Sequence, residues 1–412
     1  MNIKHRLTAN IIYLYFLTFA KILFPLLTFP YLTRVLSVET YGMVSYVRAT
    51  IIYMQIFIEF GFGLSAVKDI AKLHDKKLVV GKITGNVIVA KVLLSILAFG
   101  ALLILCYKIP LLGQNMTYVL TSFGVVFLSI FILDFLFRGL EEMQLVSLSF
   151  IIMKGISMLF TFVFVKGDST VLWIPILDIL SSFSAIFFVR YEVKKFDIQI
   201  QVTSFTDVWG TLKESFIYFI SNMATTVFGA LNTMLIGIYI SDTKEIAYWS
   251  VAMTLISGAQ TLFNPIIGGI YPQMVKNPSL KILKRVFKTF MPIVILGCIF
   301  TFFFADKIIY IINGPNYSKA AILLKLLVPV LIFSFPAMLI GWPTLGAINH
   351  PSKVTFSTIL SSCIQIIGLI LLITLDKFTL IALALLRNFT EYILLMSRFL
   401  FCLFYRDEFR NE

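Results

Sequence analysis

Four basic residues lie deep within long apolar stretches of the N-terminal half of the chain: Lys21, Arg48, Lys91 and Lys154. A lysine or arginine at the centre of a membrane costs about 3 kcal/mol even on a permissive insertion scale, so such residues need carboxylate partners or a function. Glu59 and Asp178 are the acidic residues at similar depth. Even if each neutralises one cation, the group keeps net positive charge. We therefore predict a water-filled cationic cavity that binds an anionic cargo.

The C-terminal half carries charges whose spacing leaves two interpretations open. Arg387 and Glu391 are four residues apart, so they share a helix face and could either neutralise each other or bind cargo. Arg387 therefore joins the candidate cargo-binding residues. Lys325 lies near the end of its apolar stretch, where a lysine side chain can extend to the membrane surface. Asp134 and Arg138 have the same i, i+4 spacing and predict a structural salt bridge.

The energy source for transport must also be sought among the intramembrane charges. The chain has no GxxxxGK[ST] loop, so the sequence indicates no ATPase. The membrane potential or a proton or sodium gradient remains, with three carboxylates as candidate ion-coupling groups: Glu59, Asp178 and Glu391. The three histidines fall in loops, and the four cysteines are scattered without ligand spacing. The sequence therefore indicates no metal site and no cofactor.

The elements that must position these side chains are membrane-spanning helices. Of 412 residues, 59% are apolar and only 13% are charged, and the mean hydropathy is +0.94. Apolar runs of about 20 residues, which cross roughly 30 Å of hydrocarbon, recur along the whole chain. We expect an all-α integral membrane protein of about twelve spans, near 9–34, 41–67, 82–106, 117–138, 143–165, 169–190, 214–241, 245–272, 288–312, 320–347, 354–375 and 378–404.

Basic residues are distributed unevenly between the two sides of this predicted membrane. Of the 34 lysines and arginines, 20 fall on the side of the N-terminus, 7 on the opposite side and 7 within the spans. The positive-inside rule therefore places both termini in the cytoplasm. The net charge of +13 then reflects this bias and attraction to anionic membrane lipids, and does not indicate nucleic-acid binding.

A polar interruption near the middle of the chain separates six predicted spans from six. We predict an N-terminal six-helix lobe at 1–191, a cytoplasmic linker at 192–213, and a C-terminal six-helix lobe with a short cytoplasmic tail at 214–412. A weak internal repeat supports this division. Two such lobes around a central cavity would move cargo by alternating access.

Four segments spread along the chain form a recognisable set: PLLTFPYLTRVL at 25–36 followed by YG at 41–42, EFGFGLS at 59–65, FLFRGLE at 135–141 and INGPNYSKA at 312–320. Together they resemble the O-antigen and polysaccharide repeat-unit flippases of the multidrug/oligosaccharidyl-lipid/polysaccharide exporter superfamily. Leu136 and Arg138 depart from the tryptophan and glutamine of the family pattern, which leaves open what that loop contacts.

The resemblance implies a cargo and a cellular setting. The cargo would be an oligosaccharide on undecaprenyl pyrophosphate, such as an O-antigen repeat unit in lipopolysaccharide biosynthesis. It would cross from the cytoplasmic to the outer leaflet of a bacterial inner membrane, with a polysaccharide polymerase and glycosyltransferases as partners. The pyrophosphate would need the cationic side chains identified above: Lys21, Arg48, Lys91, Lys154 and Arg387.

Two other functions were weighed against this interpretation. An ion-coupled multidrug antiporter of the same superfamily would move organic cations and would need an acidic cavity, which the buried basic residues do not provide. A membrane polysaccharide polymerase would need a large outer loop with catalytic groups, and the predicted outer loops are short. We therefore expect a transporter and not an enzyme.

Overall fold

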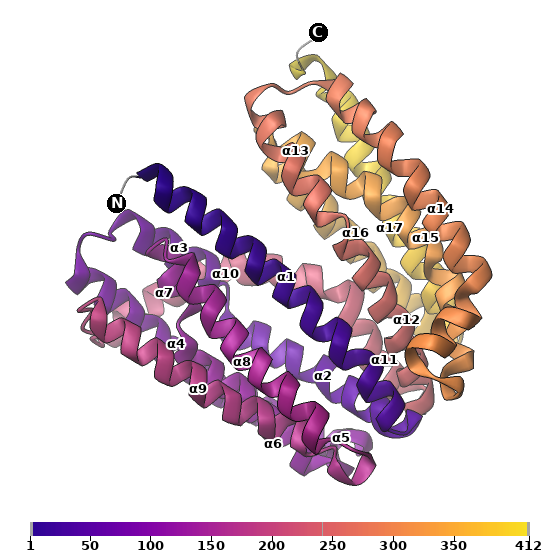
Figure 1. The fold of residues 1–412 in the computed structure, drawn as a ribbon, viewed down its shortest axis with the longest axis horizontal. Helices are drawn as coiled ribbons and strands as arrows, with labels where there is room; N and C mark the ends of the chain where they lie inside the picture. Colours follow the sequence, from indigo (N-terminus) through magenta and orange to yellow (C-terminus); the bar gives the residue numbers. More distant parts are fainter. Residues whose placement is uncertain (1–2, 241, 410–412) are drawn as a thin grey trace. The chain divides into compact units, whose positions relative to one another are not determined.

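The computed structural model describes residues 3–240 and 242–409, and at residues 3–12, 14, 15, 221, 224, 225 and 227 it describes the backbone alone. Within these residues the chain is helical and contains no strand, which confirms the predicted all-α class. The chain divides into two compact units, unit 1 (Met1–Met223) and unit 2 (Ala224–Glu412) (Figure 1). The predicted linker at 192–213 falls inside unit 1.

From residue 3 onward, unit 1 contains ten α-helices, of which the last crosses the unit boundary, and two short 3-10 turns. The helices are α1 (Ile3–Val35), α2 (Val38–Glu59), α3 (Phe62–Lys72), α4 (Lys77–Lys108), α5 (Pro110–Gln114), α6 (Met116–Ser129), α7 (Asp134–Gly139), α8 (Met143–Phe164), α9 (Trp173–Lys195) and α10 (Phe205–Thr226), and the turns are η1 (Ile130–Ile132) and η2 (Asp168–Thr170).

Unit 2 contains seven α-helices, two π-helical turns and two 3-10 turns within its described residues. They are η3 (Val227–Leu231), α11 (Asn232–Tyr239), α12 (Thr243–Thr261), α13 (Asn264–Lys276), α14 (Leu280–Asn313), η4 (Pro315–Tyr317), α15 (Ser318–Ile340), η5 (Gly341–Gly346), α16 (Pro351–Thr374), α17 (Leu380–Phe404) and η6 (Arg406–Glu408).

Among the described residues, 11 helical stretches are long and apolar enough to cross a membrane. The remaining predicted span, 214–241, corresponds to α10, the π-helical turn η3 and the short apolar helix α11. The expectation of an integral membrane protein is therefore confirmed, and the seventh span is helical throughout 205–239 with a π-helical turn at Val227–Leu231.

The second span is interrupted where the sequence carries a glycine. Phe60 (φ 42°) and Gly61 (φ 82°) adopt the left-handed conformation, so α2 ends at Glu59 and α3 begins at Phe62. A Cβ atom on Gly61 would lie only 2.5 Å from the Cβ of Tyr218 on α10. Glycine therefore serves both the backbone turn and the close approach of α10. The same break fixes Glu59 at the end of α2, where it faces α4.

The chain after α9 runs along α4 in an extended conformation before α10 begins. Gln201 donates its N–H to the Gly81 carbonyl (3.3 Å), and the Thr203 hydroxyl donates to Asn86 Oδ1 (2.7 Å). A Cβ atom on Gly81 or Gly85 would lie 2.0 or 2.1 Å from a carbonyl oxygen of this segment, so only glycine fits at both positions. Much of the predicted linker is therefore a docked part of unit 1.

In unit 2, α15 lies at the centre and contacts α12, α14 and α17 (Figure 1). Because lipid chains are as apolar as leucine, membrane helices associate through close packing and hydrogen bonds more than through hydrophobic burial. The helix α14 has few buried residues, in agreement with a lipid-facing position, whereas α15 is the most buried span of the described chain.

Candidate functional site

The first charged pair of unit 1 joins α2 to α4. Lys91 Nζ donates to Glu59 Oε2 at 2.8 Å, and the same ammonium lies 5.3 Å from the centre of the Phe135 ring. Lys91 is 4% exposed, whereas Glu59 is 36% exposed. The lysine is therefore enclosed by its partners, and the carboxylate keeps an accessible side.

A second pair joins α8 to α9. Lys154 Nζ lies 2.9 Å from Asp178 Oδ1, and the Ser157 hydroxyl donates to the same oxygen at 2.7 Å. The lysine and aspartate side chains are 36% and 23% exposed, so this pair is open to its surroundings. Lys154 can therefore interact with a ligand while it still contacts Asp178.

Two of the four predicted cations of unit 1, Lys21 and Arg48, are exposed and form no ion pair with any residue that the structure describes. The ammonium of Lys21 on α1 lies 5.5 Å from the centre of the Phe150 ring on α8, a distance typical of a cation–π contact. Arg48 lies on α2. Neither cation is held in an ion pair by a residue that the structure describes, although Asp134 lies within electrostatic range of Lys21.

The charged side chains of unit 1 form two groups, one around Asp134 and one around Tyr118. Asp134 lies within electrostatic range of Lys21, Glu59 and Arg138, and Glu59 in turn binds Lys91. Three cations and two carboxylates leave this first group with one excess positive charge. Tyr118 lies within range of both Arg48 and Asp178.

The second group is defined by its nearness to Tyr118 and contains Arg48, Asp178 and the Asp178 partner Lys154, which are two cations and one carboxylate. It also has one excess positive charge. The predicted salt bridge between Asp134 and Arg138 is present at 3.4 Å and belongs to the first group. The site of unit 1 is thus a pair of net-cationic groups, one including Lys21 and the other including Arg48.

In unit 2, the charged residues Arg387 and Glu391 are buried and paired with each other. Arg387 Nη1 lies 2.6 Å from Glu391 Oε2 on the same helix, and the two side chains are only 7% and 6% exposed. The guanidinium also lies 4.8 Å from the centre of the Phe228 ring. Of the two interpretations that the sequence left open, the geometry favours the neutral intrahelical pair, because neither charge is accessible.

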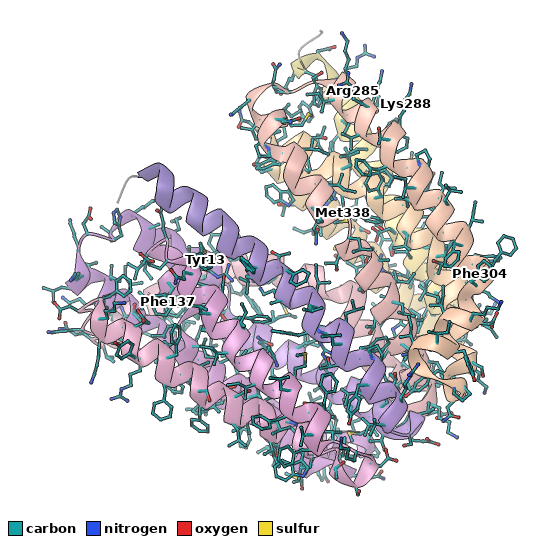
Figure 2. All side chains as sticks on the ribbon, in the orientation of Figure 1. Tyr13, Phe137, Arg285, Lys288, Phe304 and Met338 are labelled. Atoms are coloured by element: carbon teal, nitrogen blue, oxygen red, sulfur yellow. The ribbon has the colours of Figure 1, made fainter. Side chains whose placement is uncertain are left out.

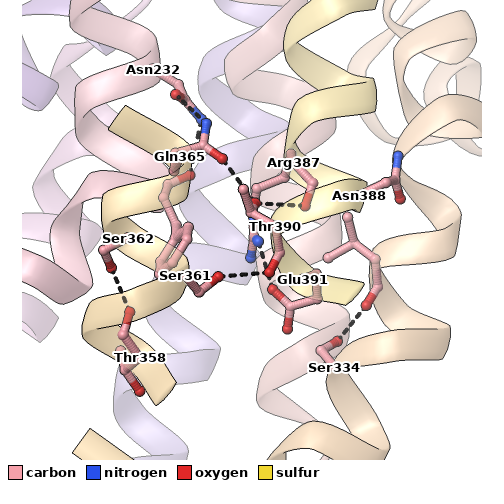
Figure 3. A network of polar contacts seen from close by, with 12 residues as sticks. Asn232, Ser334, Thr358, Ser361, Ser362, Gln365, Arg387, Asn388, Thr390 and Glu391 are labelled. Carbon is pink, nitrogen blue, oxygen red and sulfur yellow. Dashed lines mark hydrogen bonds and ion pairs between the residues drawn. The ribbon is translucent and has the colours of Figure 1, made fainter. Parts of the chain in front are cut away.

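A chain of neutral hydrogen bonds surrounds this pair (Figure 3). Gln365 Nε2 donates to Asn232 Oδ1 at 3.2 Å, and Thr390 Oγ1 donates to Gln365 Oε1 at 2.8 Å. Ser361 Oγ donates to the Thr390 carbonyl at 2.6 Å. These side chains are buried, and their bonds connect α11, α16 and α17 within unit 2. A buried polar network of this kind holds helices together in a fixed arrangement.

A second buried cation of unit 2, Arg398, donates hydrogen bonds to neutral groups and lies within electrostatic range of Glu391. Its guanidinium donates to the Ala337 carbonyl (2.8 Å), Ser357 Oγ (3.1 Å) and Thr358 Oγ1 (3.1 Å). A Cβ atom on Gly341, where the π-helical turn η5 begins, would lie 2.9 Å from the guanidinium. Arg398 therefore links α15, α16 and α17 beside this turn.

Sequence reasoning named the charged residues of both units but missed several of their partners. Gln365 and Thr390 were not identified, although Ser357, Ser361 and Gln365 recur every four residues and so share one face of α16. Asp306 was also missed. Lys325, which was expected to extend to the membrane surface, lies with its ammonium 2.6 Å from Asp306 Oδ2.

The helices and their charges define an all-α integral membrane protein with charged side chains inside its apolar helical stretches. The family model described as "Polysaccharide biosynthesis protein" matches residues 7–277, well over half of the chain. The chain belongs to this family, which confirms the resemblance seen in the sequence.

Individual proteins extend the comparison. A protein of Escherichia coli K12 named "Putative O-antigen transporter" is 28% identical over 364 residues, which are 87% of each chain. The lipid II flippase MurJ, in an inward closed conformation, matches with a TM-score of 0.73 at 14% identity over 98% of this chain and 88% of MurJ.

An inward-facing multidrug transporter of the MATE family matches with a TM-score of 0.68 at 12% identity, over 93% of this chain and 97% of its own. At such identities the structural matches establish the fold alone. The Escherichia coli relative and a second relative from Shigella dysenteriae are both named as transporters, so the chain is grouped with transporters and not with enzymes.

Proposed function

We propose that this protein is a flippase for oligosaccharide repeat units linked to undecaprenyl pyrophosphate, such as O-antigen units. It moves them from the cytoplasmic to the outer leaflet of a bacterial inner membrane by alternating access of its two helical units. Both termini lie in the cytoplasm, and the polymerase and glycosyltransferases that use the same lipid carrier are its partners. Membership of the polysaccharide biosynthesis family and the flippase-like fold support this cargo class.

The observation that carries the proposal is the excess of positive charge in unit 1. Lys21 and Arg48 are exposed and form no ion pair with a described residue, and each belongs to a group with one more cation than carboxylate. A pyrophosphate carries several negative charges and binds well to lysine and arginine donors. An organic cation, the cargo of a multidrug antiporter, would be repelled by the same groups.

The three candidate coupling carboxylates differ in access. Glu59 and Asp178 are partly exposed, each beside a lysine, whereas Glu391 is sealed against Arg387. A proton or sodium ion that binds a carboxylate must displace its lysine partner, which would free that lysine for the cargo. Glu59 and Asp178 therefore fit a coupling function better than Glu391. Flipping rates measured after separate collapse of the pH and sodium gradients test this: rates unchanged in both cases would exclude ion coupling.

The proposed function is tested by flipping itself. The purified chain is placed in liposomes with a short-chain prenyl-pyrophosphate oligosaccharide, and exposure of the glycan to an external glycan-modifying enzyme is followed. The double variant Lys21→Gln/Arg48→Gln removes both unpaired charges and should slow protein-dependent exposure about tenfold or more, because a hydrogen bond to a charged group contributes about 1.5–3 kcal/mol.

A matched control removes two exposed lysines from predicted outer loops. Lys108→Gln/Lys377→Gln changes the net charge by the same amount and should flip at the rate of the unaltered protein. Equal flipping by the Lys21→Gln/Arg48→Gln variant and the unaltered protein would show that these residues do not bind the cargo. If folded protein flips none of several glycans, transport of organic cations is measured next, and its detection would replace the flippase with the antiporter.

A further inference from the structure

The first turns of α14 carry a dense set of basic side chains: Lys281, Lys284, Arg285 and Lys288. Their spacing of three, four and seven residues puts them on one face of the helix. All four are exposed, and none forms an ion pair with a described residue. The sequence contains no aspartate or glutamate between residues 246 and 305, so no acidic residue of the neighbouring segments can neutralise them.

The membrane boundary predicted from the sequence puts the charged face at the depth of lipid headgroups. The predicted span begins at residue 288, and α14 begins eight residues earlier, at Leu280. At 1.5 Å per residue, Lys281 lies about 10 Å beyond the predicted hydrocarbon boundary and Lys288 lies at that boundary. The polar layer on each side of a bilayer is roughly 5–8 Å thick. The four cations therefore extend through this layer.

The same helix face continues as a lipid-facing apolar surface. Ile299 and Phe303 follow Lys281 and Arg285 at whole multiples of about 3.6 residues, and they are 49% and 72% exposed. Leu296 beside them is 65% exposed. Figure 2 shows Arg285 and Lys288 at one end of α14 and Phe304 towards its other end. A molecule bound along this face would meet cations at its head and hydrocarbon along its tail.

The acidic groups near the C-terminal end of unit 2 are already engaged. Glu408 accepts from His350 Nε2 at 2.9 Å, and Asp407 lies 3.6 Å from Arg406 Nε. The basic segment that leads into α4 in unit 1 differs in a further way, because acidic residues are interspersed there and Lys77 lies 3.9 Å from Asp197. The α14 cluster is therefore the more strongly cationic of these two surfaces.

We propose that Lys281, Lys284, Arg285 and Lys288 form a binding site for the headgroups of anionic phospholipids of the cytoplasmic leaflet, with the acyl chains along the exposed face of α14. The charge complementarity and the continuous apolar face select this occupant over a soluble anion. A free phosphate would gain nothing from Leu296, Ile299 and Phe303. The site shares no residue with the cargo groups of unit 1, and only its assignment to the cytoplasmic leaflet rests on the orientation proposed with the flippase function.

The test measures lipid retention by the full chain. Purified protein in mild detergent is titrated with phosphatidylglycerol or with phosphatidylcholine, and bound lipid is counted by native mass spectrometry. The unaltered chain should retain phosphatidylglycerol preferentially. The triple variant Lys284→Gln/Arg285→Gln/Lys288→Gln should lower that affinity about tenfold or more and leave retention of phosphatidylcholine unchanged, since each cation near an anionic surface contributes several-fold to the affinity.

Two further variants make the outcome decisive. Lys72→Gln/Lys76→Gln/Lys194→Gln removes three exposed cations elsewhere and should retain phosphatidylglycerol like the unaltered chain. Lys281→Arg/Lys284→Arg/Lys288→Arg keeps the charge and should also retain it. An unchanged affinity in the α14 glutamine variant, or an equal loss in the Lys72/Lys76/Lys194 control, would overturn the site. Displacement of phosphatidylglycerol by an equimolar prenyl pyrophosphate would overturn the phospholipid as its occupant.

Discussion

Unit 1 and unit 2 contain the same kinds of charged side chain at membrane depth and hold them in opposite ways. In unit 1, Lys21 and Arg48 are exposed, and the Lys154–Asp178 pair keeps an open side. In unit 2, Arg387 and Glu391 are sealed against each other, and Arg398 is enclosed by neutral acceptors. Lys21, Arg48 and Lys154 of unit 1 are therefore accessible. Arg387, Glu391 and Arg398 of unit 2 are instead part of its framework.

This difference shows that an intramembrane charge does not by itself indicate a binding site. A buried pair satisfied by its own helix leaves no net field for a ligand, while an unpaired cation needs a counter-ion from outside. The network of Gln365, Thr390 and Asn232 adds to the rigidity of unit 2. We infer that unit 1 binds the anionic part of the cargo and that the corresponding charges of unit 2 stabilise the fold.

The largest effect is expected from Arg387→Met. It leaves the charge of Glu391 buried without a partner, which costs about 3–5 kcal/mol, and the thermal unfolding temperature in detergent should fall sharply. The double variant Arg387→Met/Glu391→Leu should recover most of the loss, because a buried ion pair and an apolar pair of similar size differ little in stability. Unfolding of the single variant at the temperature of the unaltered protein would show that the pair is not structural.

A smaller loss of stability is expected from Gly85→Ala. The new Cβ atom would lie 2.1 Å from the Gln201 carbonyl oxygen, so the extended segment must shift away from α4. Overpacking of this kind costs about 1–3 kcal/mol. Proteolysis rates of the segment and the unfolding temperature measure the change. Gly100→Ala is the control: outside its own helix backbone nothing lies within 4 Å of the new Cβ, so it should neither lower the unfolding temperature nor speed proteolysis. Similar behaviour of both variants would show that the segment does not dock on α4.

The sequence predicts a membrane span or an ion pair well when the residues that form it are close together in the chain. Helix length and hydropathy are properties of continuous segments, so the fold class and most spans were predictable. The pairs Asp134–Arg138 and Arg387–Glu391 were recognisable because both partners lie one turn apart on one helix.

The partners of Lys91 and Lys154 are 32 and 24 residues away on other helices. Residue type and approximate depth allow several pairings among these charges, and only packing selects one. Gln365 was not predicted for a related reason. It is neutral, so the sequence alone gives no sign that it needs polar partners, and only the structure shows its hydrogen bonds to Asn232 and Thr390.

A modest effect on stability and a clear effect on coupling are expected from Asp178→Asn. The pair with Lys154 is partly exposed, so its loss should cost about 1 kcal/mol or less. Transport by the variant should lose its dependence on the coupling gradient. The asparagine amide is not protonated near neutral pH, and it carries no charge to attract a sodium ion. The unfolding temperature and the gradient dependence of flipping are measured together. A loss of stability as large as that of Arg387→Met would remove the contrast between the two units.

The smallest effect is expected from Lys325→Gln in unit 2. Its ammonium lies 2.6 Å from Asp306, but the two side chains are 32% and 64% exposed, so their interaction should contribute about 0.5 kcal/mol or less. Both the unfolding temperature and the flipping rate should stay close to those of the unaltered protein. If this variant instead slowed flipping as much as Lys21→Gln/Arg48→Gln, an accessible cation of unit 2 would also bind cargo. Cargo binding would then follow exposure in both units, and unit 2 would no longer be only a framework.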